Sequence, residues 1–86
     1  MILSNKIFYI EGNLYEDKLF IDKFQINPNY RGKHMSYFIW NFLLNRYKVD
    51  IHLLAFFTLK SYYLKMGFKD LGIADDEGYH EFVLKY

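Results

Sequence analysis

The sequence of 86 residues contains no cysteine and only one proline. Without a thiol, the chain has no disulfide framework, no thiolate zinc site and no cysteine nucleophile. Long hydrophobic runs are also missing: none approaches the roughly 18 residues that a membrane-spanning helix needs. No signal peptide precedes Lys6. We therefore expect a cytoplasmic protein that has no membrane partner.

An excess of charge of one sign is missing as well. Eleven Lys and Arg residues stand against ten Asp and Glu residues, which gives a formal net charge of +1. A nucleic-acid-binding surface usually needs clustered positive charge, so this balance disfavours a nucleic-acid partner. A single-strand binder that stacks bases on Tyr and Phe remains the alternative of that class. The three histidines (His34, His52 and His80) lack the spacing of metal ligands, and we expect no metal site.

What the chain has in abundance is aromatic side chains, with nine Tyr and nine Phe. Aromatic residues bury a large area each, which helps a chain near the lower size limit for a self-sufficient core. No linker, repeat or low-complexity segment divides the sequence. We therefore expect residues 1–86 to form a single domain.

The hydrophobic pattern predicts strands in the first third of the chain and alternating elements after it. Residues 6–11 read as a strand, Gly12-Asn13 as a turn and residues 14–17 as a short return strand. Residues 18–26 alternate, which predicts a strand with Leu19, Ile21 and Lys23 on one face and Phe20, Phe24 and Ile26 on the other.

Further along, the pattern predicts a helix over 35–47, a buried strand over 50–56 and a second helix over 58–66. Thr58 is the expected N-cap of that helix and Gly67 its C-cap. A short strand over 68–73, an acidic turn over 75–78 and a last strand over 79–85 complete the chain. The order β-β-β-α-β-α-β-β predicts a mixed-sheet α/β (α+β) domain.

The segment from Ile26 to Ser36 carries the strongest functional signal. Pro28 ends the preceding strand because it cannot donate to the ladder, and the basic loop of residues 31–33 leads into the helix. Loop amides and the positive end of a helix together stabilise a phosphate or pyrophosphate. The sequence therefore predicts an anion site here, with an ordinary solvated turn as the alternative.

The helix over 35–47 is apolar almost all round, since Tyr37, Trp40 and Leu44 widen the stripe made by Phe38, Ile39, Phe42 and Leu43. A helix of this kind is usually covered on both sides. The second cover would come from the core of the chain itself or from another copy, in a homodimer through the 35–47 helix.

Two blocks of residues resemble the GNAT acetyltransferases. The family pattern of an apolar-x-Pro step, then Arg/Gln-x-x-Gly-x-Gly/Ala and a helix, is matched by Ile26-Asn27-Pro28 and residues 31–36. A strand of the form Ile-x-Leu-x-Ala and a helix bearing Tyr-x-Lys-x-Gly-Phe follow in the family, and residues 51–55 and 63–68 match them. The resemblance implies a GNAT-like fold that lacks the first strand and the first two helices.

The resemblance also implies a chemistry for particular residues. Acetyl-CoA would be the cosubstrate, with its pantetheine arm on backbone groups of Phe24, Gln25 and Ile26. Its pyrophosphate would lie on the amides of residues 31–36, namely Arg31, Gly32, Lys33, His34, Met35 and Ser36. Tyr63 would be the general acid, because a phenol with a pKa near 10 arrives protonated at neutral pH. Asp22 would be the base. The non-catalytic alternatives are that Tyr63 is an ordinary core residue and that Asp22 is an exposed strand residue.

The sequence departs from the family pattern at three places. His34 stands where the family has Gly, Phe56 stands where it often has Asn or Gln, and only residues 1–5 precede the expected first hairpin. The short start leaves the acceptor side without a wall, which suits a lysine on a protein acceptor. Very short GNATs of phages and mobile elements, some of them anti-CRISPR proteins, suggest an effector that acts on a host protein. The alternative function is an inactive GNAT-fold module that binds a protein partner.

Overall fold

The computed structural model of the chain describes residues 1–32 and 34–86. Within these residues, six strands and two α-helices follow one another. They are β1 (Ile2–Ser4), β2 (Phe8–Leu14), β3 (Lys18–Ile26), α1 (Met35–Tyr47), β4 (Asp50–Phe56), α2 (Lys60–Lys65), β5 (Lys69–Ile73) and β6 (Tyr79–Leu84). Two short 3₁₀ turns, η1 (Pro28–Tyr30) and η2 (Phe57–Leu59), precede the helices. The mixed α/β class predicted from the sequence is confirmed.

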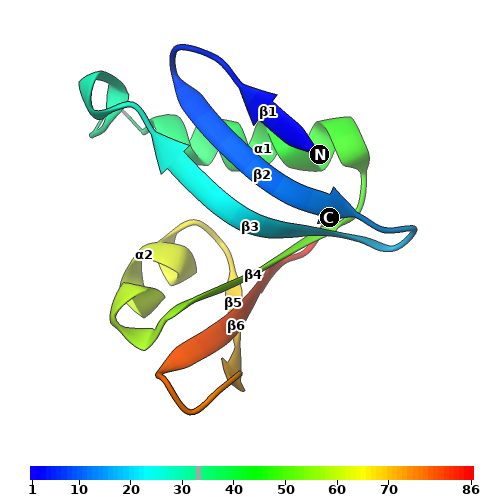
Figure 1. Cartoon of the computed structure of the whole chain (residues 1–86), viewed down its shortest axis with the longest axis vertical. Coiled ribbons are helices and arrows are strands. Elements are labelled where there is room, and N and C mark those ends of the chain that lie inside the picture. The colour runs from blue at the N-terminus through cyan, green and yellow to red at the C-terminus, as the bar shows by residue number, and fades with distance from the viewer. Residues whose placement is uncertain (33) are drawn as a thin grey trace.

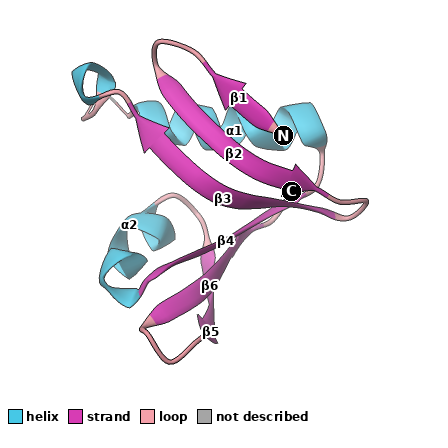
Figure 2. Cartoon of the chain, in the orientation of Figure 1, coloured by secondary structure: helices cyan, strands magenta, loops and turns pink. Residues whose placement is uncertain are grey.

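The strands form one sheet in the order β1-β2-β3-β4-β6-β5. All neighbours are antiparallel except β3 and β4, which pair in parallel only from Lys18↔Asp50 to Ile21↔Leu53. Beyond that pair the two strands diverge, and α2 lies in the opening between them (Figures 1 and 2). Helix α1 crosses behind β1, β2 and β3 (Figure 1). The sheet is therefore split at the level of Ile21.

Strand β3 has a bulge at Asp22. Glu11 pairs with Lys23 and the next residue, Gly12, pairs with Ile21, so Asp22 has no partner on β2. The extra residue changes the alternation, and Ile21 and Phe24 both turn to the core side of the sheet. The prediction that Phe24 and Ile26 lie on the face opposite Leu19 and Ile21 is therefore wrong, as is the prediction of Lys23 on the core face.

The first hairpin also differs from the sequence prediction. Gly12 and Asn13 lie within β2, not in a turn, and the chain reverses after Leu14, where the Tyr15 amide donates to the Lys18 carbonyl at 2.8 Å. A Cβ at Gly12 would lie 2.5 Å from the Phe20 carbonyl oxygen. Gly12 is therefore needed because β2 and β3 approach each other closely here. The sequence predicted a turn because glycine is common in both situations. The predicted return strand over 14–17 is absent, and β1 takes its place in the sheet.

The second helix begins later than predicted. Thr58 lies inside η2, and α2 starts at Lys60 after Leu59, which has no side chain able to cap it. The prediction of Thr58 as N-cap is wrong because the 3₁₀ turn occupies that position. Gly67 ends the helix as predicted, with φ +98° and with the Phe68 amide donating to the Tyr63 carbonyl at 3.0 Å.

The core lies between the sheet and the helices and centres on Trp40, Leu19, Ile51 and Phe82, all nearly inaccessible to solvent. Helix α1 buries one face through Ile39, Trp40 and Leu43. Its other face exposes Tyr37, Phe38 and Phe42. Of the two covers considered for this face, the core of the chain itself is therefore excluded among the described residues. Among the described residues, no helix has the length and apolar character to cross a membrane.

Candidate cofactor-binding site

Within residues 1–32 and 34–86, the split in the sheet leaves one edge of β3 without a strand partner from Asp22 onward. The Asn27 amide donates to the carbonyl of Ile7, the residue just before β2, at 2.8 Å, so the backbone amide of Asn27 faces the β2 side. Hydrogen-bonded and non-hydrogen-bonded pairs alternate along an antiparallel ladder. Gln25 therefore bonds toward β2, while the backbone groups of Phe24 and Ile26 point away from β2, toward the opening.

Arg31, in the loop that follows β3, reaches back to this free edge. The Arg31 side chain donates from Nε to the Ile26 carbonyl at 3.1 Å, which holds the loop against the end of β3. Gly32 has φ +77° and His34 has φ +57°, both in the left-handed region. These turns bring the chain to the start of α1, where the amides of Met35 and Ser36 have no partner within the helix.

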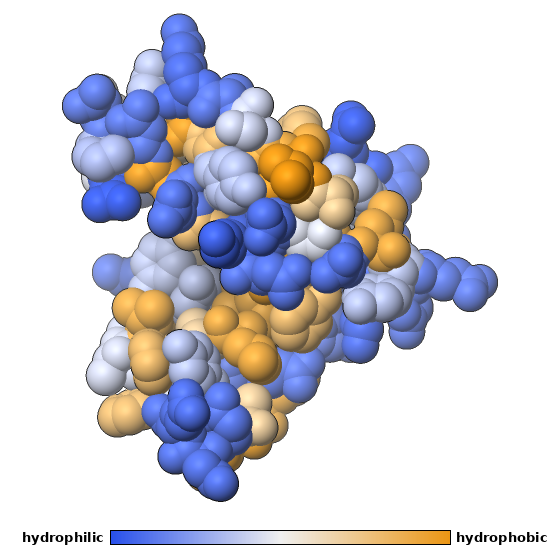
Figure 3. Space-filling model, viewed as in Figure 1, coloured by the Kyte–Doolittle hydropathy of each residue, from blue (hydrophilic) through white to orange (hydrophobic). Residues whose placement is uncertain are grey.

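A pocket of about 640 Å³ lies between this loop, the end of β3 and α2. Figure 3 shows the surface indented on this side of the molecule, between the upper and lower parts of the view. The pocket is lined by most of the residues predicted for the site, namely Phe24, Ile26, Arg31, Gly32, His34, Met35, Ser36 and Tyr63. Residues separated by about 40 positions in the sequence therefore meet in one cavity.

Two predicted cofactor-binding residues are not among those that line this pocket. Gln25 lies on a neighbouring pocket of about 510 Å³, which Ile26 and Arg31 share. Lys33 lies outside the described residues. Sequence reasoning also missed four lining residues, Tyr30, Leu59, Tyr62 and Met66. Leu59, Tyr62 and Met66 are three and four residues apart, as on one face of a helix. This spacing could have predicted that they lie together.

Tyr63 is packed among aromatic rings at the wall of the pocket. Its ring stacks on Phe82 at 5.2 Å between centroids and meets Phe68 and Tyr62 edge to face. The side chain is 9% exposed. Burial, with a smaller contribution from Tyr62, raises the pKa of Tyr63 to about 12. The phenol is therefore protonated at neutral pH and able to donate a proton.

His34 directly precedes α1 and is exposed. Its side chain makes no capping hydrogen bond to the helix. A left-handed conformation at a residue with a Cβ costs about 1 kcal/mol or more, and glycine adopts it freely. The backbone conformation at this position is thus the one for which the GNAT pattern uses glycine.

Asp22 lies apart from Tyr63. It lines a smaller pocket of about 230 Å³ together with Leu54, Asp75 and Tyr79. Asn13 donates to its carboxylate at 2.9 Å. Leu54 points to the face of the sheet opposite Leu53, because side chains alternate along β4. The structure therefore places the predicted acid and the predicted base on opposite faces of the sheet, on either side of its split.

No protein-family model matches the sequence, and no curated protein does. Solved structures do match. A GNAT-family protein from Bacteroides thetaiotaomicron superposes with a TM-score of 0.74 over 93% of this chain, at 18% identity. An acetyltransferase of the GNAT family from Listeria monocytogenes superposes with a TM-score of 0.67 over 92% of this chain, at 16% identity. The chain has the GNAT fold.

The GNAT-like chain covers only part of these larger proteins, 55% of the first and 56% of the second. The anti-CRISPR protein AcrVA5 is similar in length. It superposes with a TM-score of 0.64 and 17% identity over 94% of this chain and 95% of its own. At these identities the likeness establishes the fold alone.

Proposed function

We propose that this protein is an acetyl-CoA-dependent N-acetyltransferase that transfers acetyl directly to an amine. The observation that carries the proposal is the meeting of three features in one pocket. These are the loop residues 31 and 32 with the helix start at residues 34–36, the edge of β3 at Phe24 and Ile26, and the phenol of Tyr63. The GNAT fold of the chain supports the same reading.

The residues of the pocket fit coenzyme A. Amides at the start of α1 suit a pyrophosphate, because they lack helical partners and lie at the positive end of the helix dipole. The outward backbone groups of Phe24 and the Ile26 amide suit an amide-bearing pantetheine arm, in the manner of an added strand, while the Ile26 carbonyl already accepts from Arg31. The apolar wall of Leu59 and Met66 suits the hydrocarbon part of that arm. Acetyl-CoA would supply the acetyl group as a thioester.

Tyr63 and Asp22 have complementary roles in the proposed transfer. Transfer forms the bond between the amine nitrogen and the acetyl carbon and breaks the carbon–sulfur bond. Tyr63 would give its phenolic proton to the leaving thiolate and recover one from solvent. Asp22, directly or through an ordered water, would take the proton that the amine loses. Holding the reactants at the split would supply most of the rate enhancement.

We further propose that the acceptor is a lysine on a protein. Asp22 and Asp75 are the residues with a formal charge that line the small pocket on the opposite face, and both are acidic, which suits an approaching ammonium group. The similarity in length to an anti-CRISPR protein supports an effector that acts on a host protein.

The test of the cofactor is calorimetry of acetyl-CoA and coenzyme A with the purified protein. We expect micromolar binding of both. If neither binds at millimolar concentration, the acetyltransferase function fails and the second candidate takes its place. That candidate is an inactive GNAT-fold module that binds a protein, and the exposed aromatic face of α1 favours it.

The same face of α1 supports a homodimer as a further proposal. Tyr37, Phe38 and Phe42 are 46–65% exposed and lie on one helix. Sedimentation of the wild-type chain and of Phe38→Glu would test it. We expect a dimer that the substitution dissociates, and a wild-type monomer at high concentration would refute it.

A further inference from the structure

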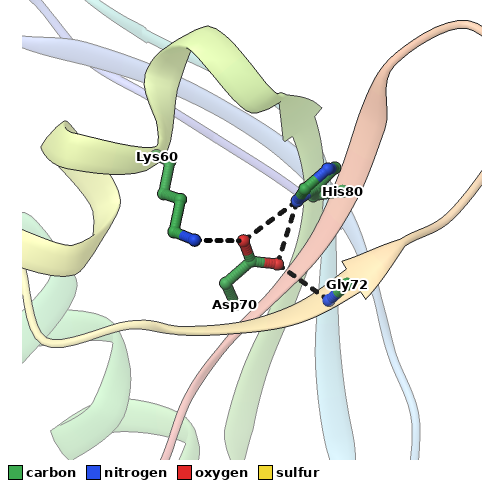
Figure 4. Close-up of polar contacts among 4 residues, drawn as sticks. All are labelled: Lys60, Asp70, Gly72 and His80. Carbon is green, nitrogen blue, oxygen red and sulfur yellow. Dashed lines mark hydrogen bonds and ion pairs between the residues drawn. The ribbon is translucent and has the colours of Figure 1, made fainter.

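Asp70 joins three elements of the fold through one carboxylate (Figure 4). Its two oxygens lie 2.9 and 3.1 Å from Nδ1 of His80 on β6. One of these oxygens is 3.3 Å from Nζ of Lys60 on α2, and the other accepts the Gly72 amide of β5 at 2.8 Å. The Asp70 side chain is 11% exposed, while that of Lys60 is 52% exposed. The carboxylate is thus a partly buried junction between α2 and the β5–β6 hairpin.

Helix α2 needs such an attachment. It has six residues, far fewer than a helix needs to be stable on its own in water. Its N-terminus has no side-chain cap, and its first residue, Lys60, places a positive charge at the positive end of the helix. The pair with Asp70 neutralises that charge and ties the first turn of α2 to β5. Gly67 fixes the other end of the helix.

The same carboxylate reaches the Tyr63 ring by a second route. His80, which Asp70 orients through Nδ1, stacks on Phe82 at 6.4 Å between centroids. Phe82 in turn stacks on Tyr63 at 5.2 Å. Tyr63 also follows Lys60 by one helical turn. Asp70 is therefore connected to Tyr63 both through the helix backbone and through a row of three rings.

We propose that Asp70 is a positioning residue, which sets the place of the Tyr63 hydroxyl at the wall of the cofactor pocket by holding Lys60 and His80. This proposal rests on the proposed acetyltransferase function, in which Tyr63 protonates the leaving thiolate. Asp70 touches neither the cofactor pocket nor the reacting atoms, since it is absent from the residues that line the pocket. Its effect on the reaction runs through Tyr63.

The kinetic test compares Asp70→Asn in the wild-type and Tyr63→Phe backgrounds, with kcat measured at saturating acetyl-CoA. In the wild-type background we expect kcat to fall by about 10-fold to 100-fold, the range that a small displacement of a catalytic group causes. In the Tyr63→Phe background we expect at most about a twofold further loss. Equal losses in both backgrounds would overturn the proposal, because a general structural defect does not depend on the Tyr63 hydroxyl.

Three further variants separate positioning from folding. Lys60→Met removes the ion pair by changing an exposed side chain, so it tests the attachment of α2 even if Asp70→Asn folds poorly. Lys60→Arg keeps the positive charge and should retain most of the kcat that Lys60→Met loses. Asp50→Asn is the matched control. Asp50 also accepts a lysine (Lys85, 3.1 Å) and a backbone amide (Tyr86, 2.9 Å), but it lies at the start of β4 and makes no contact with α2 among its hydrogen bonds. We expect Asp50→Asn to leave kcat nearly unchanged.

Hydrogen exchange gives a readout that does not depend on turnover. We expect Asp70→Asn to lower the protection of amides in residues 60–68, and Asp50→Asn to leave it unchanged. If the wild-type chain has no transferase activity, the proposed function fails, while the exchange data still decide whether Asp70 holds α2. Unchanged protection in Asp70→Asn would overturn the inference whatever the activity.

Discussion

Ile21 of β3 and Leu53 of β4 form the last pair of the parallel ladder, and the sheet opens immediately beyond them. The residue after Ile21 is the bulged Asp22, and the residue after Leu53 turns to the opposite face. The cofactor pocket and the Asp22 pocket therefore flank the same opening.

Tyr63→Phe tests the general acid. Burial raises the pKa of Tyr63 to about 12, so the phenol is protonated at neutral pH although it is a weaker acid than a free tyrosine, and the loss of its hydroxyl should lower turnover by about 10²-fold to 10⁴-fold. The affinity for acetyl-CoA should remain nearly unchanged in calorimetry. Tyr62→Phe is the matched control, since Tyr62 lines the same pocket from the same helix, and we expect it to retain most activity. A parallel loss of affinity and turnover in Tyr63→Phe would identify a packing role instead.

His34→Gly tests the left-handed turn before α1. The substitution removes the strain of a positive φ, so we expect the free energy of unfolding to rise by up to about 1 kcal/mol in urea titrations. We also expect tighter binding of acetyl-CoA, because the backbone can approach the pyrophosphate more closely. Lys48→Gly relieves the same conformation (φ +56°) at the other end of α1 and should leave affinity unchanged. Unchanged affinity in His34→Gly would mean that the His34 side chain does not obstruct the cofactor.

Gly12→Ala tests the close approach of β2 and β3. Since the new Cβ would lie 2.5 Å from the Phe20 carbonyl oxygen, backbone must shift, and we expect a loss of about 1–3 kcal/mol in the free energy of unfolding. Leu14→Ala is the control on the same strand, because Leu14 is 51% exposed and should cost much less. Equal stability of Gly12→Ala and the wild-type protein, measured by urea unfolding, would contradict the register of this hairpin.

Acid should weaken the fold through Asp70 and Asp50. Hydrogen bonds from His80 and Gly72 lower the pKa of Asp70, and hydrogen bonds from Tyr86 and Lys85 lower that of Asp50. A carboxylate with a lowered pKa in the folded state contributes stability that is complete above its unfolded pKa of about 4 and is lost as the pH falls below it. Urea midpoints of wild type and Asp70→Asn should therefore differ at pH 7 and converge toward pH 2.5. A difference in urea midpoint that stays constant from pH 7 to pH 2.5 would contradict the lowered pKa of Asp70.

The parts of the site that the sequence predicts well are local in the chain. Pro28, Gly32 and the apolar run from Met35 specify a strand end, a turn and a helix start by short-range backbone chemistry, and α1 has the predicted bounds. Only the resemblance to the GNAT acetyltransferases predicted that this loop and Tyr63 belong to one site. Periodicity cannot bring residues 31 and 63 to one pocket, because that pocket depends on the split between β3 and β4.

The errors arise where a tertiary contact overrides a local pattern. A glycine read as a turn residue is required by the neighbouring Phe20 carbonyl, and one extra residue at Asp22 reverses the expected faces of β3. The junction at Asp70 has no sequence signature, since its partners come 10 residues before and after it on different elements. Side-chain alternation predicts which face a residue takes only while the ladder stays regular.

Trp40 is the sole tryptophan of the chain and is 1% exposed. Its indole stacks on Phe24 at 4.4 Å and meets Phe68 edge to face at 5.1 Å, while its buried Nε1 has no hydrogen-bond partner among the described residues. Phe24 lines the cofactor pocket, and Phe68 contacts the Tyr63 ring. The protein therefore carries a built-in optical reporter: the intrinsic fluorescence of one residue should change when either wall of the pocket moves, without any label.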